Sequence, residues 1–157
     1  MTAHDLTLSR RSLLAGAGGL VIALHLPKAA RAQQAPAAAT FAPNAFIRVA
    51  ADSSVTVIVK HIEFGQGPFT GLATLVAEEM DADWSQMRAE HAPADVKLYA
   101  NLAFGVQGTG GSTAMANSFD QIRKAAATAR LMLVQAAAQA GKVPAGEITI
   151  EAGVLKH

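Results

Sequence analysis

The stretch that most constrains the fold of this 157-residue chain is residues 55–80, where a strand pattern runs through a glycine-rich turn into a helix pattern. Residues 55–62 are rich in Val and Ile, which is typical of a strand. Apolar residues then recur at helical spacing to the end of the stretch. Between the two patterns, Gly65 and Gly67 flank Gln66. The sequence therefore predicts a strand, a loop whose backbone a ligand can approach closely, and a helix.

Two interpretations of this loop remain open. Gln66 carries an amide that can both donate and accept, and Thr70 is expected to cap the following helix. The N–H groups at that helix start would then favour an acceptor or an anion. Alternatively, Gly65 and Gly67 serve only to turn the chain between two elements.

A second glycine-rich segment, residues 108–114, precedes a long Ala-rich run with helical spacing. Its residues form a phosphate cradle in outline, because glycines permit close approach and the first helical N–H groups point at an anion. The candidate binding residues here are Gly110, Gly111, Ser112, Thr113 and Ala114. The alternative is a simple N-cap for the long helix. A P-loop would need a Lys before the hydroxyl residue, and the dinucleotide fingerprint would need Gly where Thr113 stands.

The remaining patterns predict an α+β fold with mixed β-strands and two main helices. Residues 45–49 and 55–62 are expected to form a hairpin, residues 87–91 a further strand, residues 93–107 a long loop, and residues 148–155 a closing hairpin.

Individual side chains near the end of the first helix also carry expectations. Trp84 is expected as a buried anchor. The carboxylates of Glu78, Glu79 and Asp81 suggest a solvated helix end in preference to an acid–base cluster. His61, at the end of a strand, is interpreted as an ordinary strand residue rather than a ligand.

The N-terminal residues resemble a targeting segment. Arg10 and Arg11 precede the apolar run 13–26, and residues 30–32 read Ala-Arg-Ala, which is typical of a cleavage site. We therefore expect a twin-arginine (Tat) signal peptide over residues 1–32, a linker over 33–42, a domain over 43–157, and a periplasmic, membrane-associated location. An uncleaved anchor is the alternative, although the run is short for a membrane span.

Composition excludes several kinds of site. The chain has no cysteine, so it supplies no disulfide, thiolate zinc site or Cys-ligated iron–sulfur cluster. The 13 basic and 12 acidic residues become nine and eleven once residues 1–32 are set aside, and no basic stripe predicts nucleic-acid binding. The five histidines lack metal-ligand spacing, and no nucleophile–base pair is recognisable. We predict no metal ligand and no catalytic residue in this chain.

The order of motifs resembles the molybdopterin-binding large subunit of the xanthine oxidase family. The residues that carry the resemblance are EFGQGPFT at 63–70, LVAEE at 75–79, DW at 83–84 and GTGGSTA at 108–114. The chain is most similar to the N-terminal portion of the isoquinoline 1-oxidoreductase β-subunit and aldehyde dehydrogenase large-subunit type. The likeness covers residues 43–157.

This resemblance implies a molybdenum hydroxylase that oxidises an aldehyde or an N-heterocycle with a molybdenum–molybdopterin cytosine dinucleotide cofactor. It places Gly65, Gln66 and Gly67 against the pterin. It places Gly110, Gly111, Ser112, Thr113 and Ala114 at the phosphate groups. The implied partners are an iron–sulfur small subunit, a c-type cytochrome, the remaining part of the large subunit and a small substrate.

The family also has a loop near the molybdenum and a late glutamate base, and neither pattern occurs in these 157 residues. We therefore expect this polypeptide alone to be inactive, as a truncated or split subunit would be. One alternative is an exported, non-catalytic interaction module that keeps the fold without the cofactor. Another is a small phosphate- or nucleotide-binding protein, which rests on residues 108–114 alone.

Overall fold

The computed structural model describes residues 7–8, 40–41 and 44–157 of the chain. The signal peptide expected over residues 1–32 and the linker expected over 33–42 lie outside the described residues, apart from the pairs 7–8 and 40–41. The continuous part, residues 44–157, contains both glycine-rich loops and every predicted binding residue.

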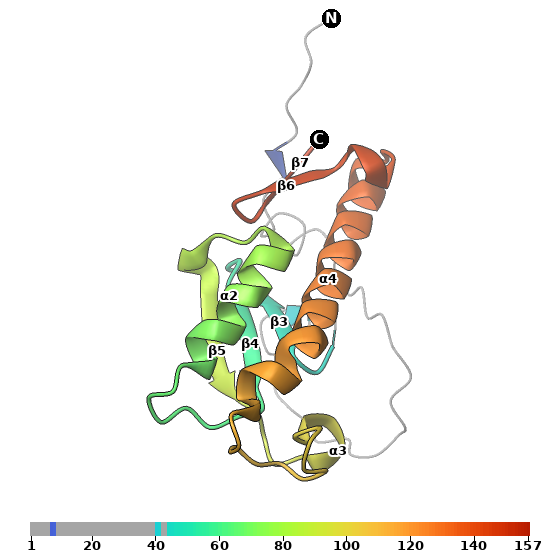
Figure 1. The fold of residues 1–157 in the computed structure, drawn as a ribbon. Helices are drawn as coiled ribbons and strands as arrows, with labels where there is room; N and C mark the ends of the chain where they lie inside the picture. Colours follow the sequence, from blue (N-terminus) through green and yellow to red (C-terminus); the bar gives the residue numbers. More distant parts are fainter. Residues whose placement is uncertain (1–6, 9–39, 42–43) are drawn as a thin grey trace, which may run out of the picture.

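The central sheet has four strands in the order β2-β3-β4-β5 (Figure 1). Strands β2 (Thr40–Phe41), β3 (Ile47–Ala50) and β4 (Val55–Val59) run antiparallel to one another, while β5 (Met87–His91) lies parallel to β4. The predicted hairpin is confirmed, with Ile47 paired to Val57. The predicted third strand is confirmed as β5.

Two long helices lie side by side against this sheet (Figure 1). Helix α2 (Pro68–Met80) connects β4 to its parallel neighbour β5, and helix α4 (Thr113–Gly141) packs along α2. Both helices begin at the end of the molecule where β4 and β5 finish (Figure 1). The sheet and the two helices enclose one apolar core, whose largest fully buried side chains are Ile47, Val49, Val55, Val57, Val59, Leu72, Val76, Met80, Ile122, Leu133 and Leu155. The α+β prediction is therefore confirmed.

Helix α2 begins earlier than predicted. Its N-cap is Gly67, in the left-handed conformation with φ 88°, and Pro68 takes the first helical position. Proline suits that position because it has no N–H to leave unpaired and its φ is already helical. Thr70 lies inside the first turn, so its prediction as the N-cap was wrong.

The acidic end of α2 is matched by basic residues of α4. Glu79 forms an ion pair with Arg123, and Asp81 forms one with Arg130. All four side chains keep contact with solvent. The carboxylates are thus spread along a helix–helix seam, in agreement with the solvated interpretation.

Trp84 is 54% exposed, so the prediction that it is a buried anchor was wrong. It starts a short 3-10 turn, η1 (Trp84–Gln86), which Asp83 caps by accepting from the Ser85 N–H. This turn carries the indole outward at the point where the chain enters β5. Met87, which follows the turn, is buried in its place.

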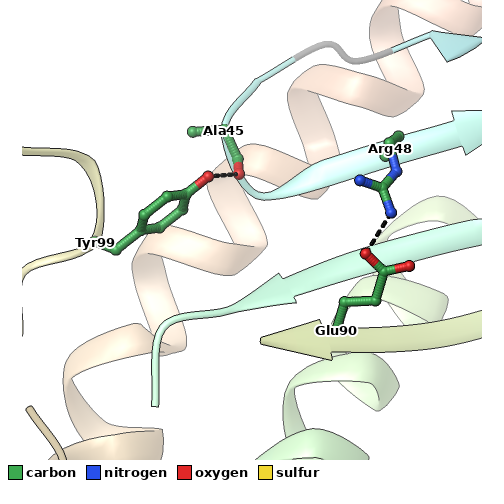
Figure 2. A network of polar contacts seen from close by, with 4 residues as sticks. All are labelled: Ala45, Arg48, Glu90 and Tyr99. Atoms are coloured by element: carbon green, nitrogen blue, oxygen red, sulfur yellow. Dashed lines mark hydrogen bonds and ion pairs between the residues drawn. The ribbon is translucent and has the colours of Figure 1, made fainter. Parts of the chain in front are cut away.

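The long loop predicted over residues 93–107 contains one short helix, α3 (Val96–Tyr99). Figure 2 shows how the end of α3 is attached to the sheet: the Tyr99 hydroxyl donates to the Ala45 carbonyl oxygen at 2.8 Å. The same view shows Arg48 of β3 paired with Glu90 of β5. The loop is therefore fastened to the segment that enters β3.

A second, three-stranded sheet has the order β1-β7-β6. A 3-10 turn η2 (Ala145–Glu147) follows α4, and β6 (Thr149–Glu151) and β7 (Val154–Lys156) then form the predicted closing hairpin. The outer edge of β7 pairs with β1 (Thr7–Leu8). No helix among the described residues has the length and apolar character needed to cross a membrane.

Candidate cofactor site

The fold brings the two predicted loops together. A hollow of about 400 Å³ opens between the starts of α2 and α4. Its lining consists of Phe64, Gln66, Thr109, Gly110, Gly111, Ser112, Thr113, Ala114 and Met115. Of the predicted binding residues, Gln66 and the whole set from the second loop therefore border one space. Gly65 and Gly67 belong to the same turn as Gln66 but do not line the hollow.

The start of α2 is already occupied by a carboxylate of the chain itself. Glu63 Oε1 accepts from the N–H groups of Gly65 at 2.6 Å and Gly67 at 3.1 Å, and its Oε2 accepts from Phe69 at 3.2 Å. These bonds, with Gly67 the largest contribution, hold the pKa of Glu63 below its usual value. A charged Glu63 thus fills the place where a helix start would hold an external anion.

The Gln66 side chain folds back onto its own loop. Its Oε1 accepts from the Phe64 N–H at 2.8 Å, and its Nε2 donates to the Ile62 carbonyl at 2.6 Å. The amide keeps one further N–H, and the side chain is exposed on the wall of the hollow. Gln66 therefore shapes the loop and can offer one donor to a bound group.

The start of α4 has no such carboxylate, and its N-cap residue, Ser112, makes no side-chain cap hydrogen bond. The N–H and the hydroxyl of Thr113 both donate to the Gly110 carbonyl, at 3.1 and 2.6 Å, so these two donors are already used within the loop. The N–H groups of Ala114 and Met115, next in the first turn, receive no side-chain cap. The open anion-binding position is thus at α4.

Glycine is required in the two loops either for backbone conformation or for the space that a missing side chain leaves. Gly65, Gly67 and Gly111 have φ values of 105°, 88° and 58°, which side chains rarely adopt. Gly110 has no such backbone constraint, and a Cβ placed there would meet no atom within 4 Å. The missing side chain at Gly110 therefore leaves open space beside the start of α4, as close approach by a ligand requires.

Sequence reasoning missed two residues that build this site. Glu63 was quoted as part of the loop, but its capping role was assigned to Thr70. Thr109 was not selected, yet its Oγ1 accepts from the Ile62 N–H at 2.8 Å and so ties the second loop to the first. The position of Glu63, four residues before Gly67, was a sequence signal for its capping role. The role of Thr109 had no such signal, because it depends on a contact between residues 47 positions apart.

A second hollow, of about 450 Å³, lies at the carboxyl ends of β4 and β5, and Thr109 borders both spaces. His61 lies at its floor with only 1% of its surface exposed, and its Nε2 lies 3.1 Å from Ser118 Oγ. Burial lowers the pKa of His61, and the nearby Lys60 lowers it further. The ring is therefore neutral at pH 7 and packs against α4, although His61 lies two residues beyond the end of β4 and not inside the strand, where it was predicted.

The hollow between the loops is uncharged. No Lys, Arg, Asp or Glu is among its lining residues, and no cluster of metal-ligating side chains occurs in the described part of the chain. An anionic group would be held there by backbone N–H groups and hydroxyls.

Comparison with known families identifies the protein family of this chain. A family model described as a molybdopterin cofactor-binding domain matches residues 16–157. The chain belongs to this family. The resemblance drawn from the two glycine-rich loops is thereby confirmed. The match to the molybdopterin cofactor-binding domain begins inside the segment expected to be a leader.

Two relatives support this assignment. The chain is 41% identical over 156 residues to isoquinoline 1-oxidoreductase subunit beta of Brevundimonas diminuta, covering 96% of the chain and 20% of the relative. It is 31% identical over 140 residues to a membrane-bound aldehyde dehydrogenase [pyrroloquinoline-quinone] of Gluconacetobacter polyoxogenes, covering 85% and 17%. The chain thus spans about a fifth of the length of these relatives.

The hollow of this molybdopterin cofactor-binding domain offers a chemical counterpart to two parts of such a cofactor. Its open helix start and the space beside Gly110 suit a phosphate group, which needs donors and close backbone approach. The wall at Gln66 offers an amide to a more neutral, ring-shaped portion. Both chemical ends of the predicted ligand therefore have a counterpart in the residues present.

Proposed function

We propose that this chain forms the cofactor-binding part of a molybdenum hydroxylase that oxidises an aldehyde or an N-heterocycle. The observation that carries the proposal is the single hollow lined by Gln66 and by all five predicted residues of the second loop. Membership of the molybdopterin cofactor-binding family and the names of the two relatives support the same reaction class.

In this proposal the two loops have separate tasks. The N–H groups of Ala114 and Met115, with the Ser112 hydroxyl, hold the phosphate end at the open start of α4. Gln66 orients the pterin end with its remaining amide N–H. The bound cofactor supplies the redox centre, and this chain contributes binding and orientation. The general base that the reaction requires would come from the remaining part of the large subunit.

The finer identity of the cofactor and its partners belongs to the same proposal. We infer the cytosine dinucleotide form of the cofactor, because the chain is most similar to the subunit type that the sequence resemblance named. Electrons would leave through a separate iron–sulfur subunit and a c-type cytochrome, since this chain has no cysteine with which to hold a cluster. The name "subunit beta" of one relative is consistent with a multi-subunit enzyme.

We further propose that the protein is exported by the Tat pathway. Arg10 and Arg11 before an apolar run support this proposal, and so does the small-residue site at residues 30–32. That pathway carries folded proteins, which suits a protein whose cofactor is inserted before export. The mature protein would then work in the periplasm, beside the membrane.

The direct test is analysis of the protein purified from its own host. We expect molybdenum by mass spectrometry, a pterin by fluorescence after oxidation, and cytidine monophosphate after acid hydrolysis. Pyrroloquinoline quinone in place of the pterin would overturn the proposal and favour the cofactor in the second relative's name. Protein without any of these groups would favour the non-catalytic module.

A pair of glycine variants tests the location of the site. Gly110→Asp places a carboxylate at the open start of α4, where it would compete with phosphate. We expect molybdenum per chain to fall roughly tenfold, as repulsion between two close, partly shielded charges allows. Gly146→Asp is the matched control, because a Cβ there also meets no atom within 4 Å and the residue lies in η2. Equal metal content in both variants would place the phosphate elsewhere.

A further inference from the structure

Asn101 is a buried polar residue that no part of the proposed function has used. Only 1% of its surface is exposed. Its Nδ2 donates to the Gly108 carbonyl at 3.1 Å and to Thr113 Oγ1 at 2.7 Å. Its Oδ1 accepts from the N–H of Ala103 at 3.0 Å and from Asn117 Nδ2 at 2.6 Å. Every donor and acceptor position of the amide is therefore filled.

The backbone of Asn101 closes the loop that follows it. Its N–H donates to the Val106 carbonyl at 2.9 Å, and its carbonyl accepts from the N–H groups of Phe104 and Gly105 at 3.0 and 2.9 Å. The side chain thus spans from this closed turn to the first and second turns of α4. One residue fixes the shape of the loop and its distance from the helix start.

The same contacts continue to both walls of the hollow. Asn101 holds the Gly108 carbonyl, and the next residue, Thr109, accepts from the Ile62 N–H. The Ile62 carbonyl in turn accepts from Gln66 Nε2. On the other side, the Thr113 hydroxyl that Asn101 contacts donates to the Gly110 carbonyl. Hydrogen bonds, linked by the backbone of Gly108–Thr109 and of Ile62, therefore connect Asn101 with each predicted cofactor loop.

We propose that Asn101 is a positioning residue that holds the Gly108–Thr113 loop in the shape that receives the cofactor. This inference rests on the proposed function, because it assigns Asn101 a task at the same site. Asn101 does not line the hollow, so it acts through Gly108 and Thr113 rather than by contact with a ligand. Without its two donors, Asn101 no longer holds the Gly108 carbonyl at one end of the loop or the Thr113 hydroxyl at the other.

The test compares Asn101→Asp with Asn44→Ala in the holoprotein purified from its own host. Asn101→Asp keeps the acceptors for Ala103 and Asn117 but removes both donors. Asn44 also makes three side-chain hydrogen bonds, to Ala125, Phe46 and Ile47, and none of them reaches residues 101–115. Hydrogen exchange of residues 101–115 and molybdenum per folded chain are measured for each variant and for the unmodified protein.

We expect Asn101→Asp to raise amide exchange in residues 101–113 and to lower molybdenum per chain, each on the order of tenfold. Asn44→Ala should lower the unfolding temperature without a local change in the loop or a loss of metal. If Asn101→Asp does not fold, Asn117→Ala replaces it, because it removes one bond to Asn101 without touching the hollow. This variant should show the same two changes at smaller size.

The outcomes separate the two proposals. Unmodified protein that carries molybdenum, with Asn101→Asp or its substitute showing unmodified exchange and metal content, overturns the positioning role alone. Local exchange equal to that of Asn44→Ala at the same loss of unfolding temperature also overturns it, because the role would then be general stability. Unmodified protein without molybdenum overturns the proposed function, and the inference about Asn101 falls with it.

Discussion

The two helix starts of the site differ by one carboxylate. Glu63 accepts from backbone N–H groups at the start of α2, whereas Ser112 provides no side-chain cap at the start of α4. A helix start carries a partial positive charge that one anion largely satisfies. A phosphate therefore has a reason to bind at the start of α4 and not at that of α2.

The first prediction concerns the pH dependence that Glu63 confers. Its pKa is lowered in the folded chain, chiefly by the Gly67 N–H and then by the other loop N–H groups. Its stabilising contribution is therefore complete above the ordinary value of 4.5 and is lost as the pH falls through the lowered folded-state value. We expect Glu63→Gln to lower the unfolding temperature at pH 7 and to converge with the unmodified protein in acid.

The control for this experiment is Glu78→Gln on the same helix. Glu78 is exposed and makes no side-chain hydrogen bond among the described residues. This variant should run parallel to the unmodified protein across the pH range. A constant difference in unfolding temperature between Glu63→Gln and the unmodified protein, from neutral pH into acid, would show that the charge of Glu63 has no part in capping α2.

For single residues, the sequence predicted local backbone conformation better than side-chain contacts. The glycine at position 67 was selected for its conformational freedom, and its φ of 88° confirms that freedom is needed. Thr70 was preferred as the cap because hydroxyl residues commonly cap helices, but Pro68 takes the first helical position and the N-cap is Gly67, three residues earlier. The role of Asn101 could not be predicted, because its partners Thr113 and Asn117 come near it only in the folded chain.

Helix α4 stabilises the fold through one apolar stripe. Its buried residues Ile122, Ala126, Ala129, Leu133 and Ala137 recur every three or four positions and face α2 and the sheet. The small residues in this stripe let the two helices approach closely. The opposite side of α4 is open to solvent and includes Leu131, which is 55% exposed.

The second prediction compares two leucines of this helix. Leu133 is 2% exposed within the core, and Leu131 lies on the outer side. Leu133→Ala should lower the free energy of unfolding by about 2–4 kcal/mol, because it removes buried methyl groups and leaves a cavity. Leu131→Ala should change it by less than about 0.5 kcal/mol. Urea titration followed by circular dichroism measures both, and equal losses would contradict this account of the core.

The elements themselves were largely predictable from local patterns. Runs of strand-forming residues predicted β3 and β4, and helical spacing predicted α2 and α4, because burial against one core favours these patterns. The parallel pairing of β4 and β5 follows from the helix that connects them. The exposure of Trp84 was not predictable from its type, because it depends on a 3-10 turn that Asp83 caps.

At the scale of the whole molecule, the proposed export affects the fold, because the expected signal peptide contains a strand. Strand β1 (Thr7–Leu8) lies inside the expected signal peptide and pairs with β7. Cleavage after Ala32 would remove β1 and leave the outer edge of β7 without this partner. The hairpin of β6 and β7 remains attached through the Gly153 N–H, which donates to the Asp81 carbonyl at 2.5 Å.

The third prediction tests the proposed export. Replacing both Arg10 and Arg11 with Lys should leave the protein in the cytoplasm at its full length, because the Tat pathway reads the arginine pair. Arg31→Lys is the control, since it preserves charge at another position of the same segment. Cell fractionation and N-terminal sequencing measure the outcome. Undiminished periplasmic recovery of the double variant would rule out this route.

Exposed apolar side chains concentrate near the cofactor hollow. The group consists of Ile62, Phe64, Leu102, Phe104, Val106 and Phe119, each between 42% and 74% exposed. Phe64 lines the hollow, and Phe104 reaches toward Gly111 on its other side. Apolar surface gathered in one place commonly marks an interface. Because the relatives are about five times longer than this chain, we expect the rest of a large subunit to cover these side chains.

The last prediction follows from that uncovered surface. The 157-residue chain produced alone should self-associate and bind an apolar fluorescent dye, because these side chains would contact water. Phe64→Ser combined with Phe104→Ser should reduce both effects, whereas Leu131→Ser should not, since Leu131 is equally exposed but lies apart on the outer side of α4. Sedimentation velocity measures association. If the chain stayed monomeric at high concentration and did not bind the dye, these apolar side chains would not require a partner surface. The hollow would then belong to a self-sufficient binding module.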